Sequence, residues 1–565
     1  MSHKQFTFHG GVSLPSHKSA STRKAVRRAS IPKELTLPLS QHIGEPAEPV
    51  VVPGQYVLKG QVIAKASGYV SAPIHAPTSG TVSLIEKRPI PHPSNMDDTC
   101  IIIAPDGKEQ WIELNNHAQD YTALDPSKLR NLIRNSGIVG LGGAGFPTYI
   151  KHNPGPDGFV DTLIINGAEC EPYITCDDML MRERPQEIIY GLLIIKHALQ
   201  AKRCIIAIED NKPEAIDAIR TAALEFTDHN IEVSIIPSIY PAGSEKQLIQ
   251  MVTGKQVPKN DLPIHIGIVC QNVGTTAAVY RAIHHGEPLL SRYLTIAGDV
   301  KDPCNLEVLF GTSFQHLINE CGGSQSNIRR IIVGGPMMGF AMHGLDLPVI
   351  KTSNCLLIDA GQSNDLAPRK YVMPCIRCGS CADVCPVNLL PQQLYWYARS
   401  QEFNKIQEYD LFDCIECGCC DYVCPSQIPL VQYYRFAKSE VWKQEKEAQK
   451  SDLARRRHEF RTYRLEREKA EKAERHRQKK AALKSAGLAE DKTEKLAANP
   501  EKKAILEAME RVKAKKQRQK ITAKNTDNLT PTQKKLVNET DERRRLQRQS
   551  QAQTTTNADK DKSEK

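Results

Sequence analysis

The chain has 565 residues, of which 40% are hydrophobic and 25% are charged. This length predicts several domains, and no stretch approaches the roughly 18 to 20 consecutive apolar residues of a membrane span. The first thirty residues are polar and basic and lack the apolar segment of a signal peptide, so we expect a cytosolic protein. In that reducing compartment its 17 cysteines are predicted to be metal ligands or buried apolar residues.

Positive charge is concentrated at the C-terminal end. Residues 441–565 hold 36 of the 75 Lys and Arg and 21 of the 65 Asp and Glu, a net charge of +15, which leaves −5 for the first 440 residues. This tail has almost no aromatic residues after Tyr463, so we expect it to be disordered or transiently helical, with i,i+4 pairs such as Glu468/Lys472 and Glu471/Arg475. Its interleaved Glu residues and missing aromatics argue against nucleic-acid binding.

The N-terminal segment, residues 1–124, contains short β-favouring pieces separated by Gly and Pro between residues 34 and 104. This pattern predicts a small sandwich of hairpins and resembles the barrel-sandwich domain of the biotinyl/lipoyl type. That family attaches its cofactor to a lysine at a hairpin tip, where this chain has Ser67, Gly68, Tyr69 and Val70. Lys65 lies nearby and is interpreted as a solvated strand residue. We therefore expect a docking domain without a swinging arm.

Two further domains precede the clustered cysteines. Residues 125–285 alternate helical and apolar strand patterns, which predicts an α/β domain with strands at 162–165, 203–208, 232–236 and 264–269 and helices at 126–135, 186–199 and 212–224. Residues 286–350 show a strand at 293–300, a short helix near 313–321 and a strand at 330–333. This order resembles the β-grasp module of soluble ligand-binding segments, for which a structural role is expected.

Residues 351–440 contain two runs of the form C-x-x-C-x-x-C-x-x-x-C-P. The first holds Cys375, Cys378, Cys381 and Cys385, and the second holds Cys414, Cys417, Cys420 and Cys424. Three thiolates separated by two residues each allow a tight loop to wrap one [4Fe–4S] cluster, while the fourth cysteine reaches the other cluster. The pattern predicts a two-cluster ferredoxin-like domain with crossed ligation, in which Cys424 completes the first cluster and Cys385 the second.

A pair of four-cysteine zinc sites is the alternative interpretation, because zinc also uses C-x-x-C pairs. Zinc does not require four cysteines in eleven residues, a following proline and duplication of the whole unit, so iron–sulfur clusters are favoured. Cys419 is an extra thiol inside the second run, interpreted as a packed spare residue. The eight cysteines outside the two runs are predicted to be buried apolar residues.

A glycine-rich loop at residues 137–148 follows the first helix of the α/β domain. Its glycines permit close backbone approach to a phosphate. Lys151 comes directly after it, and the strand ending near Ile165 delivers Asn166, Glu169 and Glu171. The arrangement resembles the flavin-binding subunit of respiratory complex I, in which a G-x-G-G-A-G-F-P-T loop and an N-x-D-E-x-E-P segment hold FMN and orient NADH.

The resemblance implies noncovalent FMN bound by Gly140, Gly142, Gly143, Gly145, Lys151 and Asn166. It places Glu169 and Glu171 as catalytic residues beside the ring and the nicotinamide. The segment from Tyr240 to Glu245, with Gly243, resembles the family's Y-x-C-G-E-E sequence, and Asn272 begins a turn similar to N-V-E-T. The chain departs from the family at Val139, Leu141, Ala168 and Ser244.

The order of modules resembles the C subunits of the Rnf (Rsx) electron-transport complexes over residues 6–434. The resemblance includes the opening Phe8-His9-Gly10-Gly11-Val12 and the segment at residues 334–339. It implies a peripheral subunit on the cytoplasmic face of a bacterial inner membrane. Electrons would pass from NADH through FMN to the two clusters, and integral membrane subunits would couple the transfer to ion translocation.

Two other functions stay open. Corrin reductases share these modules, so a soluble flavin iron–sulfur reductase is the first alternative. The second is an adaptor that carries clusters without binding nucleotide, which the four departures from the complex I pattern permit.

Overall fold

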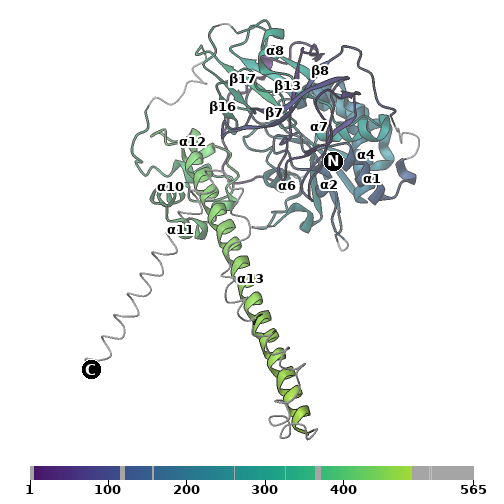
Figure 1. Cartoon of the computed structure of the whole chain (residues 1–565). Helices are drawn as coiled ribbons and strands as arrows, with labels where there is room; N and C mark the ends of the chain where they lie inside the picture. The colour runs from purple at the N-terminus through teal and green to yellow at the C-terminus, as the bar shows by residue number, and fades with distance from the viewer. Residues whose placement is uncertain are drawn as a thin grey trace. The chain divides into compact units, whose positions relative to one another are not determined.

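The computed structural model describes residues 6–114, 121–155, 158–259, 261–324, 326–362 and 371–485, together with Ala508 and Arg511. The chain divides into two compact units, Met1–Glu447 and Ala448–Lys565. The first contains all the sheets in the described residues (Figure 1). No described helix combines the length and apolar content that crossing a membrane requires.

The predicted N-terminal sandwich is present as two small antiparallel sheets. One has the order β2-β8-β7-β4 and the other β3-β5-β6. Their strands are β2 (Leu35–Pro38), β3 (Glu48–Pro49), β4 (Tyr56–Val57), β5 (Val62–Lys65), β6 (Ile74–His75), β7 (Gly80–Pro89) and β8 (Asp97–Pro105). Alternation in β2 buries Leu35 and Leu37 completely, as expected of strands with one face on a core.

The α/β domain is built on a four-stranded parallel sheet of order β11-β10-β9-β12. Its strands are β9 (Thr162–Gly167), β10 (Arg203–Glu209), β11 (Ile231–Ile236) and β12 (Ile268–Asn272). Three strands fall where they are predicted. The fourth begins later than the predicted residue 264, because the 3-10 helix η4 (Pro263–Ile266) ends at Gly267, which has a φ of 75°. Only glycine adopts that conformation without steric cost.

Helices pack against this sheet, and short helical turns connect them. The α-helices are α1 (Pro126–Asn135), α2 (Thr148–Lys151), α3 (Cys176–Glu183), α4 (Pro185–Leu199), α5 (Pro213–Ala223), α6 (Glu245–Thr253) and α7 (Val273–Tyr280). The 3-10 helices are η2 (Tyr121–Ala123) and η3 (Leu224–His229), and a π-helix, η5 (Arg281–His285), follows α7. The central strands are buried on both faces, as expected of a parallel sheet, since Leu163 of β9 packs into one core cluster and Ile164 into another. The edge strand β11 is half-buried except at Ile236.

The β-grasp module forms a six-stranded mixed sheet of order β1-β14-β13-β17-β15-β16. Its strands are β1 (Arg27–Arg28), β13 (Ser291–Gly298), β14 (Cys304–Leu309), β15 (Arg330–Val333), β16 (Phe340–Met342) and β17 (Cys355–Asp359), with helix α8 (Phe314–Glu320). The sheet therefore continues past residue 350, the predicted boundary. The reason is that β17 pairs with both β13 and β15 and fills the centre of the sheet.

The cysteine-rich segment is helical and has its own small core. Its elements are α9 (Ser380–Asp383), α10 (Pro391–Ser400), α11 (Phe403–Glu408), η7 (Leu411–Asp413), α12 (Cys419–Tyr422) and the start of α13 (Leu430–Ser485). Helices α10 and α11 pack against each other (Figure 1). Val441 of α13 is buried and Trp442 contacts Phe412, so the packed body extends past the predicted boundary at residue 440.

In the second unit, the described part of the tail continues α13 to Ser485. The helix carries i,i+4 ion pairs, as expected, although the partners differ from the predicted ones. Glu468 pairs with Arg464 and Glu471 pairs with Arg467, each with the arginine on the N-terminal side. Such exposed pairs contribute only about 0.3–0.5 kcal/mol each.

Two buried basic side chains join the sandwich, the α/β domain and the β-grasp module. Lys351 Nζ donates to the carbonyl oxygens of Pro73 (2.9 Å) and Gly137 (2.7 Å). Arg292 of β13 donates to the carbonyl oxygens of Lys351 (2.6 Å) and Leu141 (2.9 Å). Both side chains are buried, and burial lowers the pKa of Lys351 to about 7. A neutral amine has two N–H bonds, which match these two carbonyl acceptors.

We predict that Lys351→Met lowers the free energy of unfolding by about 2 kcal/mol or more, because it leaves two buried carbonyls without donors. The difference from the wild type should grow between pH 7 and about pH 10.4. In that window the unfolded lysine binds a proton that the folded one has lost, so wild-type stability rises with pH. Denaturant unfolding at several pH values measures both effects. Lys65→Met, at an exposed pair with Glu48, is the control, and an equal loss in both variants would contradict the prediction.

Candidate flavin and iron–sulfur sites

The two cysteine runs fold into two separate cavities, each lined by four of the predicted ligands. The first cysteine cavity is lined by Cys375, Cys378, Cys381 and Cys424, and the second by Cys385, Cys414, Cys417 and Cys420. Their empty volumes are similar, about 410 and 340 Å³. Each cavity thus combines three cysteines of one run with the fourth of the other, the grouping that crossed ligation requires; the ligation itself stays a prediction.

The backbone of the two loops repeats the same unusual conformations. Arg377 and Glu416, each just before the second cysteine of its run, have φ values of 58° and 56°. The glycines after that cysteine, Gly379 and Gly418, have φ values of 86° and 81°. These left-handed positions turn the chain tightly around each cavity. The soft thiolate donor sets and duplicated loops fit two iron–sulfur clusters of one type.

The two cavities differ in their surroundings. Cys378 of the first cavity is exposed, and so is the neighbouring Ile376, by 68%. In the second cavity Cys385, Cys417 and Cys420 are buried. Cys417 and the spare Cys419 pack in one apolar cluster with Tyr240 of the α/β domain. The second cavity therefore faces the α/β domain and the first faces outward. Further exposed apolar side chains precede the first cavity, at Tyr371, Val372 and Met373.

The predicted flavin residues gather at one edge of the parallel sheet. Following the chain, β10 lies beside β9 and β11 lies beside β10, whereas β12 pairs with the other edge of β9. Ligands of open α/β sheets bind at the carboxyl ends of the strands where the order reverses in this way. Asn166 lies at the end of β9 and Asn272 at the end of β12, so this edge is the candidate flavin site.

The glycine-rich loop crosses the same edge. A Cβ atom on Gly142 would lie 3.5 Å from the Asn272 side chain, whereas one on Gly143 would meet nothing within 4 Å. Gly143 and Gly145 have φ values of 115° and 65°. The loop is anchored at Leu141, whose N–H donates to Thr275 (2.9 Å) and whose carbonyl accepts from Arg292. Gly140 N–H donates within the loop to Phe146 O (2.8 Å), so the open side of the loop lies at Gly143.

Some buried polar atoms near this loop in the sequence or at the same strand edge have no partner. Within the described residues these are Thr148 Oγ1, both ring nitrogens of His152, and Gln271 Oε1 next to Asn272 in β12. Buried polar groups are normally bonded, but these atoms are closed to solvent in this structure. The open glycine backbone at Gly143 is what fits a phosphate-bearing ligand such as FMN.

The predicted lysine and asparagine are each tied to the segment around the start of α6. Lys151 Nζ donates to Glu245 (2.8 Å) and to the carbonyl of Cys270 (3.2 Å). Burial lowers the pKa of Lys151, but the charge and hydrogen bond of Glu245, together with the nearby Cys270, outweigh it, so the pKa is raised. Asn166 Nδ2 donates to Gly243 O (2.9 Å). Lys151 therefore presents a cation at the edge where Asn166 and Gly243 meet.

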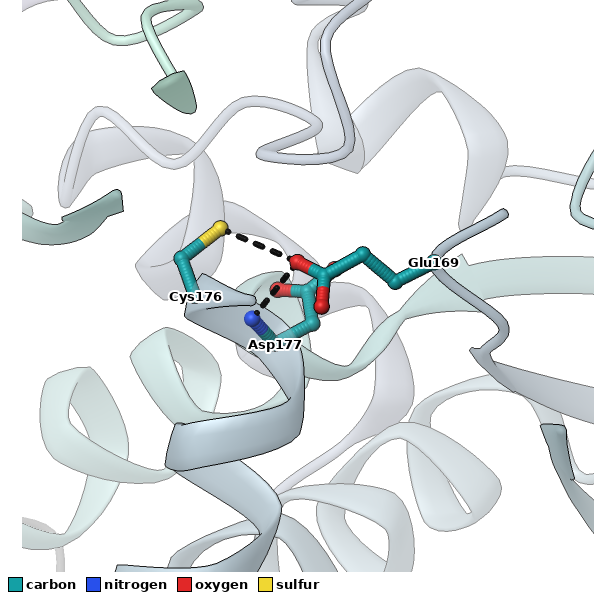
Figure 2. Close-up of side chains that lie close together, drawn as sticks. All are labelled: Glu169, Cys176 and Asp177. Atoms are coloured by element: carbon teal, nitrogen blue, oxygen red, sulfur yellow. Dashed lines mark hydrogen bonds between the residues drawn. The ribbon is translucent and has the colours of Figure 1, made fainter. Parts of the chain in front are cut away.

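Glu169 is bound at the start of a helix. Its carboxylate accepts from Asp177 N (2.9 Å) and the Cys176 thiol (3.3 Å) at the first turn of α3 (Figure 2). It also accepts from Asp178 N (3.3 Å). Burial and the charge of Glu169 raise the pKa of Asp177. The carboxylate satisfies helix N–H groups, which accounts for this cluster of possible metal ligands without an ion. The predicted role of Glu169 beside the nicotinamide stays a prediction.

Glu171 contacts the β-grasp module. Its carboxylate accepts from Met337 N (3.2 Å) and Met338 N (2.7 Å), and burial raises its pKa to about 7. A Cβ on Gly335 would lie 2.0 Å from Glu171 Oε2, so a larger residue there would displace the Glu171 side chain. The segment at residues 334–339, which the sequence singled out, thus covers Glu171. The catalytic role predicted for Glu171 stays a prediction.

The sequence did not indicate Lys18, which organises this acidic segment. Lys18 Nζ donates to the carbonyls of Glu169 (2.7 Å), Glu171 (2.9 Å) and Ile174 (2.5 Å). Burial lowers its pKa. A lysine in a polar N-terminal segment is normally solvated, and no local pattern distinguishes this one. Asp177, which accepts from Asn272 Nδ2 (2.7 Å), was missed for the same reason.

Crossed ligation predicts that Cys385→Ser damages the cluster held by the Cys414 run. EPR of the reduced variant should lose the second cluster's signal, and iron should fall from about eight to about four atoms per chain. Cys419→Ser is the matched control, because this buried thiol lines the same cavity but is not a predicted ligand. Selective loss of the Cys375 cluster instead would show that ligation is not crossed.

Four family models match the chain in the order of its domains. The RnfC barrel sandwich hybrid domain matches residues 6–108 and the Nuo51 FMN-binding domain matches residues 133–281. The SLBB domain matches residues 293–341 and the 4Fe-4S dicluster domain matches residues 374–428. The chain therefore contains an FMN-binding domain and an iron–sulfur domain of known families, on the segments where the two sites lie.

Related proteins match over most of the chain. One relative is a protein of Vibrio cholerae serotype O1, named as the C subunit of an ion-translocating oxidoreductase complex. It is 47% identical over 527 residues, which cover 93% of this chain and 66% of the relative. This chain therefore spans slightly less than two thirds of that relative's length. The protein of that name from Pectobacterium atrosepticum is 43% identical, over 90% of this chain and 70% of the relative. A solved NAD+-reducing [NiFe]-hydrogenase structure is 17% identical with a TM-score of 0.40, over 57% of this chain and 63% of that one. By its sequence similarity, the chain belongs to the family of C subunits of ion-translocating oxidoreductase complexes.

Proposed function

We propose that this chain is the electron-input subunit of a membrane-bound, ion-translocating oxidoreductase complex, with FMN at the switch point of the parallel sheet and a [4Fe–4S] cluster in each cysteine cavity. One observation carries the proposal. The loop of the second cysteine cavity is bonded to the same segment that contributes to the flavin edge, since Tyr240 Oη donates to Cys417 O (2.6 Å) and Gly243 and Glu245 follow three and five residues later.

Bound FMN supplies the conversion between two-electron and one-electron transfer. Around it, the roles of the chain's own residues follow from their contacts. The backbone at Gly143 is open for a phosphate, and Lys151 offsets negative charge on a phosphate or a reduced ring. Asn166 and Gly243, held together by one hydrogen bond, fix the position of the strand end. NADH is the proposed electron donor, with Glu169, Glu171 and Glu245 on its side of the site.

The different exposure of the two cavities supports an order of transfer. The second cavity packs against the α/β domain, and the first opens to the surface at Cys378. Electrons from the flavin edge would therefore enter at the second cavity and leave at the first. The exposed apolar side chains beside Ile376 suit contact with another subunit of the complex, because burial of apolar surface stabilises association.

The relatives' name, as subunits of an ion-translocating complex, supports membrane coupling. We infer that integral membrane subunits bind this chain at the cytoplasmic face of the bacterial inner membrane and carry the ion. The chain itself would be peripheral. A cluster-carrying adaptor is the second candidate, and a specific feature favours it: Val139 and Leu141, which replace arginines of the complex I loop, are both buried and offer no charge to a dinucleotide.

We predict that Lys151→Met weakens FMN binding by at least about tenfold, because a cation beside the phosphate or the ring is lost. A charge-assisted contact of about 1.4 kcal/mol corresponds to that factor. Fluorescence titration of flavin-free protein with FMN measures the dissociation constant. Lys202→Met, at a lysine of the same domain that lies over the Phe159 ring, should bind FMN as the wild type does. If Lys151→Met bound FMN with the same dissociation constant as the wild type, Lys151 would not contribute to FMN binding.

NADH should bleach first the flavin and then the iron–sulfur absorbance of anaerobically purified protein, which is expected to contain FMN and about eight iron atoms. Stopped-flow absorbance follows the two steps. Bleaching by dithionite but not by NADH would favour the adaptor, which takes its electrons elsewhere. Protein with clusters and no flavin would overturn the proposed flavin site. NADH-driven reduction of a corrinoid in the absence of other subunits would favour a soluble reductase.

A further inference from the structure

The main-chain carbonyls of three predicted ligands of the second cysteine cavity accept hydrogen bonds from side chains. His9 Nδ1 lies 3.1 Å from Cys385 O, Tyr240 Oη lies 2.6 Å from Cys417 O, and Lys438 Nζ lies 2.7 Å from Cys414 O. A carbonyl oxygen only accepts, so His9 Nδ1 carries the proton. Within the described residues, no side chain donates to a carbonyl of the four ligands of the first cavity. The difference separates two loops that are otherwise repeats of each other.

Two of the three donors come from outside the ferredoxin-like segment, and two glycines allow them to reach it. A Cβ on Gly10 would lie 2.6 Å from the carbonyl group of Val384, and one on Gly11 would lie 2.8 Å from Tyr240 O. The N–H of Gly11 donates to Val384 O (3.0 Å), and Val12 exchanges two backbone hydrogen bonds with Tyr240. The opening His9-Gly10-Gly11-Val12 sequence therefore joins the α/β domain to the second cavity.

These hydrogen bonds act on the charge that a cluster acquires. A cluster held by four thiolates is anionic, and reduction adds one more negative charge, which burial disfavours. The oxygen ends of nearby peptide dipoles also oppose it. A donor on such an oxygen withdraws negative charge, and hydrogen bonding around a cluster is one of the factors that set its reduction potential. Tyr240 is only 2% exposed, so solvent weakens its hydrogen bond little.

We propose that His9 and Tyr240, with Lys438, are positioning residues that raise the reduction potential of the second cluster and leave that of the first unchanged. The inference rests on the proposed function, because it requires a cluster in each cavity. Lys438 also pairs with Glu416 (2.8 Å), which offsets its charge. His9 and Tyr240 therefore give the cleaner test.

The experiment is an anaerobic redox titration with mediators and dithionite, followed by EPR, on the full-length protein. The Cys385→Ser variant identifies which signal belongs to the second cluster. Tyr240→Phe and His9→Phe should each shift the second cluster to lower potential, by up to about a tenfold change in the reduction equilibrium, or about 59 mV for one electron. The first cluster, measured in the same sample, should not move.

Two further variants separate a specific effect from general loosening. Tyr434 is another buried tyrosine that lines the second cavity, and its hydroxyl donates to Pro391 O (2.6 Å), which is not a ligand carbonyl. Tyr434→Phe should leave both potentials unchanged. His9→Asn keeps a side-chain N–H near the position of Nδ1 and should restore most of the potential lost in His9→Phe.

An unchanged second-cluster potential in either Phe variant that retains both clusters would overturn the role of that residue, and unchanged values in both would overturn the proposal. Equal shifts of both clusters, or the same shift in Tyr434→Phe, would overturn it as well. Because dithionite replaces NADH, these outcomes do not depend on nucleotide binding. Absence of two clusters from the wild type would instead contradict the proposed function.

Discussion

The hydrogen bond from Tyr240 to the carbonyl of Cys417 lies where the two chemical parts of this protein meet. A flavin domain and a ferredoxin-like domain exchange electrons usefully only if they are held close and in one orientation. Here the contact consists of a few buried groups: Tyr240, Val12, Cys417 and Cys419 in a small apolar cluster, with Gln247 donating to Pro386 O (3.1 Å) nearby. An unpaired polar group in such a contact costs about 1–3 kcal/mol, and the Tyr240 hydroxyl and the Gln247 amide N–H are each bonded to a carbonyl. Among the described residues, Gln247 Oε1 has no partner.

The same principle operates on the other side of the flavin edge. The glycine-rich loop is packed on one side by the buried side chains of Ile138, Val139 and Leu141, and the main-chain carbonyls on that side need further support from hydrogen-bond donors. Arg292 and Lys351 supply that support by donating to the carbonyls of Leu141 and Gly137. Buried cations are costly unless bonded, and here main-chain carbonyls bond them. The loop can therefore keep an open face toward a ligand while its buried face is fixed.

The N-terminal segment is a structural part of the redox site. Residues before the sandwich contribute the Gly10–Gly11 contact with Val384 and Tyr240, Lys18 beneath the acidic segment, and β1 at the edge of the β-grasp sheet. These contacts reach the ferredoxin-like segment, the α/β domain and the β-grasp module. A short polar segment can do this because it supplies donors and glycine turns, whereas an apolar one would have to be buried along its length.

The amino-acid sequence by itself determined the modules, their order and the predicted cluster ligands. The spacing of the first three cysteines in each run is a local property, because two residues between successive thiols let one loop wrap one cavity. Which cavity the fourth cysteine joins depends on the tertiary structure, since that cavity belongs to the other run. The periodic strands and helices of the α/β domain were equally local. The tertiary structure decided what depends on distant pairing: that β12 lies on the opposite side of β9, that β17 completes the β-grasp sheet, and that Glu169 and Glu171 bind backbone N–H groups. It also decided the placement of Lys18, Lys351 and His9, since a polar residue in a polar segment gives no local sign of the carbonyl that folding brings to it.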